Sequence, residues 1–145
     1  MRIEEANPKQ LDAWSHLRAE LWPESSIEYH RTEIAEFLSK EGAIAYLACE
    51  QTGVVGFAEA TLRYDYVNGC STSPVLFLEG IYVLPENRRQ GVARSLCGAV
   101  AAWGRAAGCR EFGSDALIDN VESHAFHAAL GFAETGRVVY FRKPL

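Results

Sequence analysis

The chain has 145 residues, which is enough for one domain with a sizeable hydrophobic core. Hydrophobic residues make up 48% of the sequence and charged residues 23%, as in ordinary globular domains. The net charge of −5 argues against a nucleic-acid surface. Glu, Arg or Gly interrupt the longest apolar runs, so none is predicted to span a membrane.

The cysteines carry information about the compartment. There are 4, at positions 49, 70, 97 and 109, and no two form a C-x-x-C pair, so a metal site is disfavoured. Their even number leaves disulfides open. The N-terminus has no apolar stretch of the signal-peptide type, so free thiols in a reducing compartment are favoured. We therefore expect a cytoplasmic protein.

The first half of the chain alternates between helical and strand patterns. Asn7-Pro8 is typical of a helix start, because Asn can cap and Pro fits the first turn. In chain order we expect a strand at 2–6, a helix from Asn7-Pro8 to Pro23, a helix that a capping box at 25–28 opens and Gly42 closes, a strand at 43–50, and a long alternating strand at 54–66.

The second half contains the most apolar strand, at 75–83, which is apolar on both faces and is expected at the centre of a sheet. There follow a helix from Val92 to Ala107, a strand at 110–116, a helix from Asp119 or Asn120 to Leu130, and a closing hairpin or strand pair at 132–143. No repeat or linker divides the chain. This order predicts one α+β domain over residues 1–145, with a mixed, mostly antiparallel sheet and one βαβ crossover.

The turn RRQGVA, at 88–93, lies between the central strand and a helix. The first N–H groups of a helix have no intrahelical partner, and a glycine lets a ligand approach the backbone closely. Arg88, Arg89 and Arg94 add positive charge. The turn therefore predicts an anion site that suits phosphate or pyrophosphate. The alternative is a solvated basic turn that only caps the helix.

This turn resembles the R/Q-x-x-G-x-G/A signature of the GCN5-related N-acetyltransferase (GNAT) superfamily, and the order of elements up to Gly131-Phe132 is similar to the family's order. The resemblance implies the GNAT acyltransferase fold, with about four helices around the sheet, and acetyl-CoA held by its pyrophosphate at the turn. Several stretches resemble a narrower group, the aminoglycoside 6′-N-acetyltransferases: LWP at 21–23, RYDYVNG at 63–69, SPVLFLEGIYVLPENRRQG at 73–91, SDALIDN at 114–120, SHAFHAALGF at 123–132 and RVVYF at 137–141.

The resemblance also implies where the coenzyme binds. A bulge at Gly80 would free backbone N–H groups that hold the thioester carbonyl, although ordinary strand curvature is the alternative. The predicted coenzyme-binding residues are Ile81, Tyr82, Val83, Arg88, Arg89, Gln90, Gly91, Val92, Ala93, Arg94 and Asn120.

Glu79 lies in the most apolar strand of the chain, where a carboxylate is costly unless it is paired or used. One interpretation is a structural acid bonded to a neighbour. The functional interpretation is a carboxylate that binds the substrate ammonium and takes its proton, directly or through water.

Asp115 and His127 complete the predicted catalytic set. Asp115 is expected near Glu79 on the same side of the sheet, as a substrate contact by the resemblance or as a helix cap by its neighbours. His127 stands where many superfamily members have Tyr, so it is a candidate general acid toward the departing thiolate, or a packing residue. His124 and His127 form only a weak candidate for a metal pair.

The resemblance implies an acidic, aromatic substrate site. Trp22 and Tyr66 are expected walls, whose other interpretation is core or rim packing. The group can carry His where Ser25 stands and Glu where Gly136 stands, so these departures bear on the drug spectrum. The predicted substrate-binding residues are Trp22, Ser25, Tyr66, Glu79, Asp115 and Gly136.

The resemblance implies acetyl transfer from acetyl-CoA to the 6′-amine of aminoglycosides by direct attack in a ternary complex, and hence antibiotic resistance. Two alternatives stay open: an acetyltransferase for polyamines or protein amines, and a module that binds acetyl-CoA or an aminoglycoside without turnover. A homodimer is expected, with an exposed terminal strand at its interface.

Overall fold

A five-stranded sheet forms the centre of the computed structural model, which describes all residues from Met1 to Leu145. The strands lie side by side in chain order: β1 (Arg2–Glu5), β2 (Ala43–Glu50), β3 (Gly53–Arg63), β4 (Val75–Val83) and β5 (Phe112–Gly113). The first four strands pair antiparallel, and β5 pairs parallel with β4. The predicted α+β class with a mixed, mostly antiparallel sheet is therefore confirmed.

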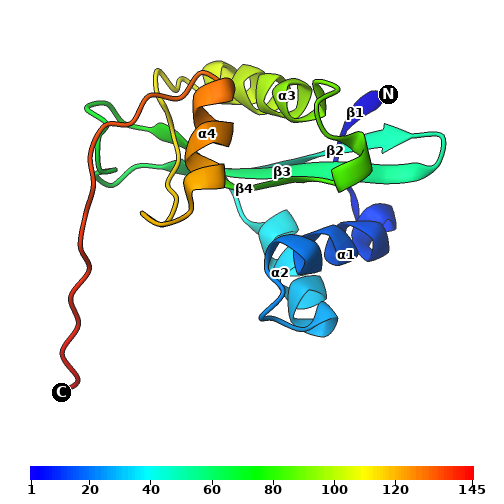
Figure 1. Cartoon of the computed structure of the whole chain (residues 1–145), viewed down its shortest axis with the longest axis horizontal. Helices are drawn as coiled ribbons and strands as arrows, with labels where there is room; N and C mark the ends of the chain where they lie inside the picture. The colour runs from blue at the N-terminus through cyan, green and yellow to red at the C-terminus, as the bar shows by residue number, and fades with distance from the viewer.

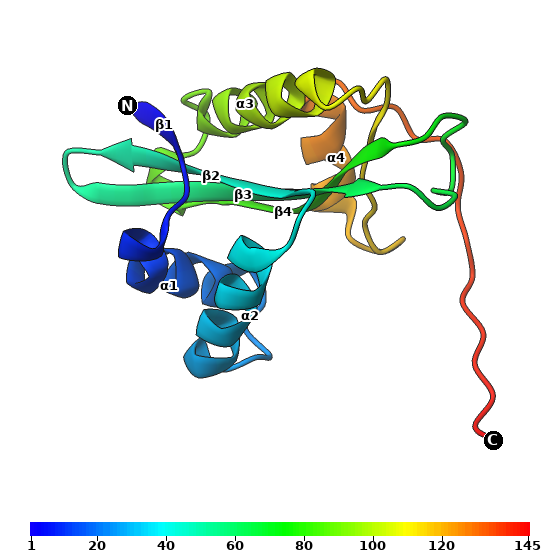
Figure 2. The same ribbon diagram turned by 180° about the vertical axis from the view of Figure 1, so that it is seen from behind.

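Helices cover both faces of the sheet (Figures 1 and 2). The helices α1 (Leu11–Leu21) and α2 (Ile27–Ser39) lie on one face, and α3 (Val92–Ala106) lies on the other. The helix α4 (Val121–Ala129) follows β5, and the 3₁₀ helices η1 (Pro8–Gln10) and η2 (Pro85–Asn87) precede α1 and α3. None of the helices has the length and apolar character needed to cross a membrane.

Local chemistry explains where the helices begin and end. Ser26, the second residue of the predicted capping box, begins α2 by accepting a hydrogen bond from the Tyr29 N–H at 3.1 Å. Asn120 begins α4 in the same way, through the Ser123 N–H at 3.2 Å. Gly108 and Gly131 follow α3 and α4 with φ of +92° and +94°, so both predicted stops are confirmed.

Two hydrophobic layers hold the helices to the sheet. On the α3 face, Leu96 and Val100 are fully buried against β3 and β4. On the opposite face, Trp14, Ile34 and Phe57 are fully buried between the two N-terminal helices and the sheet. Because both faces are covered along β3 and β4, these strands form the fixed framework of the molecule.

Three strand predictions were wrong in extent or existence. β3 ends at Arg63, so 64–66 belong to the loop before β4; β5 covers two residues instead of 110–116; and residues 132–145 form no strand. Strands need a partner, and beyond Gly113 the chain leaves β4. The C-terminal tail extends away from the body (Figures 1 and 2), with the side chains of Val138, Val139, Tyr140 and Phe141 between 51% and 93% exposed.

A buried ion pair lies under α1. Arg18 donates from Nη1 to both oxygens of Glu59, at 2.7 and 2.9 Å, and Trp14 Nε1 donates to the same carboxylate at 2.9 Å. Burial raises the pKa of Glu59 to about 7, although the Arg18 charge and the two donors act in the lowering direction. Since Arg18 and Glu59 are both buried, each depends on the other for its charge compensation.

Replacing Arg18 by Met should therefore destabilise the protein in a pH-dependent way. At pH 8 the lone Glu59 carboxylate should cost about 3–5 kcal/mol in the free energy of unfolding. Without Arg18 the folded-state pKa of Glu59 rises further above its wild-type value of about 7, so the extra loss relative to wild type grows as pH rises above about 7 and is smaller at pH 5, where the carboxyl is protonated in both folded proteins. Urea denaturation at the two pH values measures it.

The double variant Arg18→Met/Glu59→Gln is the matched control, because Gln keeps an acceptor for Trp14 Nε1 and carries no charge. It should recover most of the lost stability at pH 8. Equal losses at both pH values, or a double variant as unstable as Arg18→Met, would contradict this account.

Candidate active site

The site is built on a bulge in β4. Glu59 pairs with Gly80 and Ala60 pairs with Leu78, so Glu79 has no partner on β3. An extra residue of this kind bends a strand and re-aims its side chain. The predicted bulge is confirmed, and Glu79 is the residue that it singles out.

Trp22 packs directly on the bulge. A Cβ atom on Gly80 would clash with Cη2 of the Trp22 ring and would lie 2.7 Å from its Cζ2, so only glycine permits this contact. The ring is also stacked on His30, with centroids 6.3 Å apart, and the Arg18 guanidinium lies 4.9 Å from its centroid. His30 Nε2 lies 3.0 Å from the Trp22 carbonyl oxygen. Trp22 is thus fixed beside Glu79.

Glu79 is a paired carboxylate. Thr61 Oγ1 donates to its Oε1 at 2.7 Å, and Arg63 Nη2 donates to Oε1 and Oε2 at 2.9 and 3.1 Å. The Glu79 side chain is 30% exposed, so a ligand can reach it. Glu79 is therefore an acid bonded to its neighbours, as the structural interpretation expects. The functional interpretation is compatible with this pairing, because the carboxylate also lines a pocket.

That pocket, of about 460 Å³, lies between the N-terminal helices and the β3–β4 face. It brings together three predicted site residues, Trp22, Ser25 and Glu79. Its charged lining consists of Glu24, Glu33, Glu59 and Glu79 against Arg18 and Lys40. The acidic side chains outnumber the basic ones, so the pocket attracts cationic ligands.

The edge of β4 opposite β3 is largely bare. β5 pairs with β4 only at Leu76 and Phe77, so the strand from Glu79 to Val83 has no partner on that side. Outward backbone groups there are free of ladder bonds, as the resemblance implies for Ile81, Tyr82 and Val83. β5 ends at Gly113, so the chain leaves β4 beyond this point.

The turn after β4 has the features of an anion site. Gly91 begins α3 with φ +80° and no capping side chain, and Arg89 is also left-handed at +62°. The first helical bond runs from Ser95 N to Gly91 O, so the N–H groups of 92–94 have no helical partner. No atom lies within 4 Å of a Cβ built on Gly91, so its conformation, not crowding, requires glycine.

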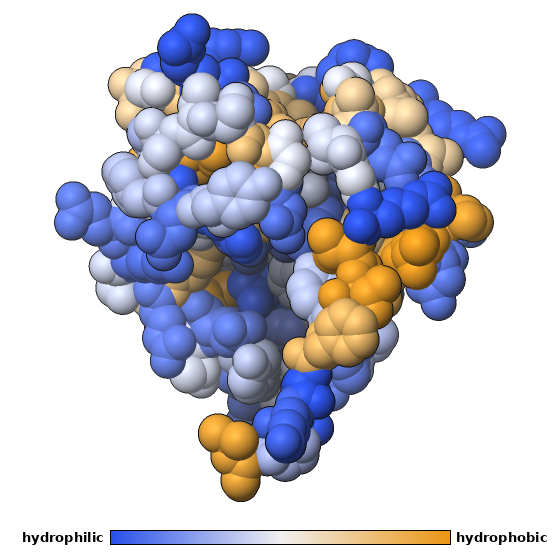
Figure 3. All heavy atoms as spheres, turned by 90° about the vertical axis from the view of Figure 1, so that its left-hand side faces the viewer, coloured by the Kyte–Doolittle hydropathy of each residue, from blue (hydrophilic) through white to orange (hydrophobic).

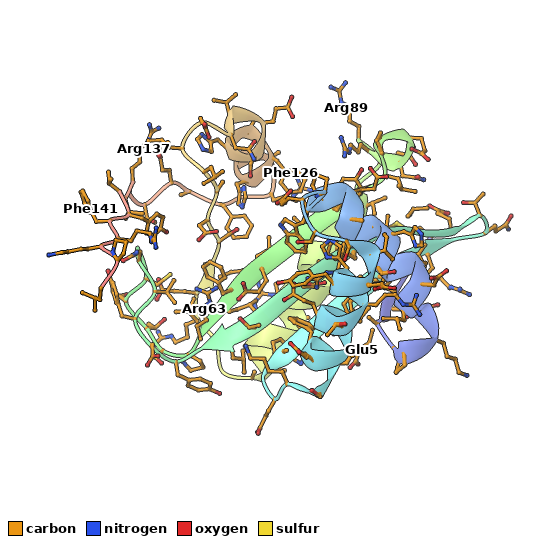
Figure 4. All side chains as sticks on the ribbon, turned by 90° about the horizontal axis from the view of Figure 1, so that it is seen from below. Glu5, Arg63, Arg89, Phe126, Arg137 and Phe141 are labelled. Atoms are coloured by element: carbon orange, nitrogen blue, oxygen red, sulfur yellow. The ribbon has the colours of Figure 1, made fainter.

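The three arginines of the turn have different surroundings. Arg88 Nε donates to the Val83 carbonyl at 2.9 Å, and Arg94 Nη2 donates to the Ala129 carbonyl at the end of α4, also at 2.9 Å. Arg89 projects from the body, as Figure 4 shows. Arg89 therefore has the most freedom to meet a ligand. Gln90 lines a separate pocket of about 580 Å³.

His127 and Ser114 form a hydrogen-bonded pair that the sequence did not suggest. His127 Nε2 lies 2.7 Å from Ser114 Oγ, and its Nδ1 donates to the Ser123 carbonyl at 2.7 Å. Donation from Nδ1 leaves Nε2 as the acceptor in the neutral ring, so Ser114 donates to it. The signal was local: Ser114 immediately precedes the predicted residue Asp115.

The other predicted residues lie outside the Glu79 pocket. Asp115 is exposed in the segment after β5, and Asn120 caps α4. Tyr66 is exposed in the β3–β4 loop. Gly136 lies on the tail, whose residue Thr135 packs on Gly69 of that loop.

Sequence reasoning also missed Arg18, Thr61 and Arg63. Glu59, Thr61 and Arg63 share one face of the alternating β3 pattern, and that shared face was the available signal. Arg18 lies within the predicted first helix, and a helical pattern alone does not indicate which partner its charge will meet.

The fold and this site are those of an acyltransferase, and comparison of the chain with known protein families identifies which one. Residues 11–132 match the model of the "Acetyltransferase (GNAT) family". The chain belongs to this family.

Two curated relatives match nearly its full length. The chain is 53% identical over 136 residues to aminoglycoside N(6′)-acetyltransferase type 1 of Serratia marcescens, covering 93% of each chain. It is 46% identical over 143 residues to the protein of that name from Salmonella typhimurium, covering 99% of each.

Solved structures agree. The apo aminoglycoside 6′-N-acetyltransferase AAC(6′)-IG of Acinetobacter haemolyticus superposes with a TM-score of 0.96 at 46% identity, covering 100% of this chain and 99% of that chain. AAC(6′)-Iy in complex with the bisubstrate analogue CoA-S-monomethyl-acetylneamine superposes with a TM-score of 0.93 at 44% identity, covering 99% of this chain and 98% of that chain.

The contact between Trp22 and Gly80 predicts a specific coupling. Gly80→Ala should lower the free energy of unfolding by about 1–3 kcal/mol, because the new methyl group meets the indole ring. Trp22→Leu removes the ring and should make the same Ala substitution cost much less. Denaturation of both single variants and the double variant gives the coupling energy. If the cost of Gly80→Ala is unchanged in the Trp22→Leu background, the proposed contact is wrong.

Proposed function

We propose that this chain transfers the acetyl group of acetyl-CoA to the 6′-amine of aminoglycoside antibiotics and so confers resistance. One observation carries the proposal: a reachable carboxylate, Glu79, lies at the bulge of an acidic pocket in a chain whose curated relatives bear this activity in their names. An aminoglycoside carries several ammonium groups, and the carboxylates of this pocket match that charge.

We assign substrate binding to residues that line the pocket and to residues that lie outside it. Trp22 offers a flat face for a sugar ring or an ammonium group, and Ser25 lies on the same pocket wall. Tyr66, Asp115 and Gly136 would contact the outer part of the substrate, since they lie outside the pocket. Similar proteins can carry His at the position of Ser25 and Glu at the position of Gly136. Ser25 is smaller than His, and Gly136 lacks the charge of Glu, so we expect this protein to have its own drug spectrum.

Coenzyme binding is assigned to the turn and the bare edge of β4. The uncapped N–H groups at 92–94, beside Arg88 and Arg89, suit a pyrophosphate. The free edge at 81–83 suits the pantetheine arm and the thioester carbonyl, whose oxygen gains negative charge during attack. Gln90 in the turn and Asn120, which caps α4, complete the proposed set.

The reaction needs a neutral amine. Glu79 accepts a proton from the 6′-ammonium, directly or through water, and the amine nitrogen then bonds to the thioester carbonyl carbon. As the carbon–sulfur bond breaks, the sulfur takes up a proton, for which the Ser114–His127 pair with a protonated imidazole is the proposed donor, and the second proton that leaves the amine nitrogen restores the pair. The products are the 6′-acetamide, coenzyme A with a free thiol, and one proton.

The cysteines support direct attack over an acyl-enzyme. Burial raises the pKa of the Cys97 thiol to about 11 and raises the pKa values of Cys49 and Cys109. Burial and the Glu111 charge raise the pKa of Cys70. A thiol attacks as its thiolate, so none of the four is activated for acyl transfer. Their free state also suits a reducing compartment, and we propose that the protein acts in the cytoplasm.

We further propose that the protein is a homodimer held by its C-terminal tail. Val138, Val139, Tyr140 and Phe141 present a continuous apolar run to solvent, and β5 leaves a sheet edge that is two residues long. Figure 3 faces the end from which the tail projects and shows hydrophobic side chains exposed beside a hollow with hydrophilic borders. Extended apolar chain of this kind gains partners by strand pairing with a second copy.

The function is tested by thiol release from acetyl-CoA. Kanamycin or tobramycin, which bear the 6′-amine, should give release, and an analogue with a 6′-hydroxyl should give none. The same assay with spermidine and a lysine peptide measures the alternative amines. Release with polyamines or peptides and not with the antibiotics would overturn the aminoglycoside assignment and retain acetyl transfer.

Two substitutions should separate chemistry from coenzyme binding. Glu79→Gln should lower kcat about 10²–10⁴-fold, the usual contribution of a general base, with little change in acetyl-CoA affinity. Gly91→Asp should abolish coenzyme binding, because it strains a left-handed residue and places a negative charge at the anion site. Calorimetry with coenzyme A and steady-state kinetics measure both. Equal effects of Glu79→Gln on affinity and turnover would remove its role as a base.

The dimer has its own test. The full chain should sediment at twice the monomer mass, and Val139→Asp/Phe141→Asp should sediment as a monomer, because both positions are exposed within one chain and charge there opposes apolar pairing. A monomeric wild-type chain at micromolar concentration would count against the proposal.

A further inference from the structure

The two oxygens of Glu79 have unequal surroundings. Oε1 accepts hydrogen bonds from Thr61 Oγ1, Arg63 Nη2 and, at 3.3 Å, Arg63 Nε, while Oε2 accepts only one, from Arg63 Nη2 at 3.1 Å. A carboxylate oxygen has room for two good donors. Oε1 is therefore saturated, and Oε2 has an open position for a further donor.

Arg63 is itself held in place. Its guanidinium lies 3.5 Å from the centroid of the ring of Phe77, two residues before Glu79 on β4. The planar guanidinium stacks on an aromatic face and forks to a carboxylate at the same time, which a lysine cannot do. Figure 4 shows Arg63 at the end of β3, where the chain enters the β3–β4 loop. An incoming ammonium thus meets a carboxylate whose cationic partner is already anchored.

We propose that Arg63 is a positioning residue of the acetyl-transfer site: it fixes Glu79 through Oε1, leaves Oε2 for the substrate amine, and by its own charge favours the neutral, nucleophilic form of that amine. This inference rests on the proposed function, because it concerns the amine that is acetylated.

The physical reason is that the carboxylates of the pocket differ in how far a neighbouring cation compensates their charge. The pocket is acidic overall, which attracts a polycation, and Glu24, which has no ion-pair partner, is available to an ammonium group that keeps its charge. At Glu79 the negative charge is already compensated by Arg63. A second cation beside a guanidinium is disfavoured, so a bound amine at Oε2 loses its proton more readily than it would at a free carboxylate.

The other charged groups near Glu79 do not reproduce this effect. Arg18 forms ion pairs with Glu59 and Glu33, with N–O distances of 2.7 and 3.0 Å. His30 contacts the Arg18 Nε and the Trp22 carbonyl, so both ring nitrogens are engaged. The remaining titratable side chains that line the pocket are those of Glu24, Tyr29 and Lys40.

The test is the pH profile of kcat, which reports ionisations in the substrate complex. Arg63→Gln removes the charge and keeps hydrogen-bonding capacity; Arg63→Lys keeps the charge and loses the fork. We expect the acid limb of the tobramycin profile to move up by about 1 pH unit in Arg63→Gln, because the bound amine holds its proton more tightly, and to stay near the wild-type position in Arg63→Lys.

The same comparison in the Glu79→Gln background removes the carboxylate's own titration, and the upward shift should persist there. Tobramycin should also bind Arg63→Gln roughly threefold more tightly than wild type at pH 6, with coenzyme A present, because one repulsive charge is gone. Arg31→Gln is the matched control. Arg31 is 42% exposed and pairs with Asp12, and Arg63 is 43% exposed, so this variant also loses one exposed arginine–carboxylate pair.

An unmoved or lowered acid limb in Arg63→Gln would overturn the proposal. So would an equal shift in Arg63→Lys, which would assign the effect to geometry, or in Arg31→Gln, which would make it a general effect of surface charge. Wild-type turnover is measured first: if no 6′-amine is acetylated, the proposed function fails, whereas turnover with an unmoved limb removes only the role of Arg63.

Discussion

The bulge at Glu79 and Gly80 is the constraint on which the rest of the site depends. One residue too many on β4 turns Glu79 out of the ladder, and the missing side chain at Gly80 lets Trp22 lie against the strand. The carboxylate and the aromatic wall of the pocket thus follow from one local irregularity. Beyond the same point β4 loses its second partner, β5, so the proposed coenzyme path begins where the substrate pocket ends.

The polar network behind the bulge explains how so charged a site is kept in place. Arg18 contacts Glu59, Glu33 and the Trp22 ring, and it links α1, α2 and β3 across the pocket wall. Buried ion pairs add little net stability, but their removal one partner at a time is costly. The network therefore holds Trp22 in one position more than it stabilises the fold. Thr61 and Arg63 do the same for Glu79 at the open end.

The sequence predicted the framework well and the periphery poorly. Apolar periodicity and capping residues located the four helices and β2 to β4, because burial and local hydrogen bonds decide those elements. Glu79 stood out because an acid in an apolar strand has few uses. The side-chain partners Arg18 and Arg63 could not be predicted, since ion pairing depends on which strands and helices meet. The tail, at 132–145, has a strand pattern without a partner in its own chain.

The most direct test of the account is a crystal structure of the protein with coenzyme A and tobramycin bound together. The account predicts the 6′-nitrogen within hydrogen-bonding distance of Glu79 Oε2, one sugar ring against Trp22, and the pyrophosphate at the N–H groups of 92–94. A 6′-nitrogen bound elsewhere, with Glu79 still enclosed by Thr61 and Arg63 and remote from the antibiotic, would contradict it.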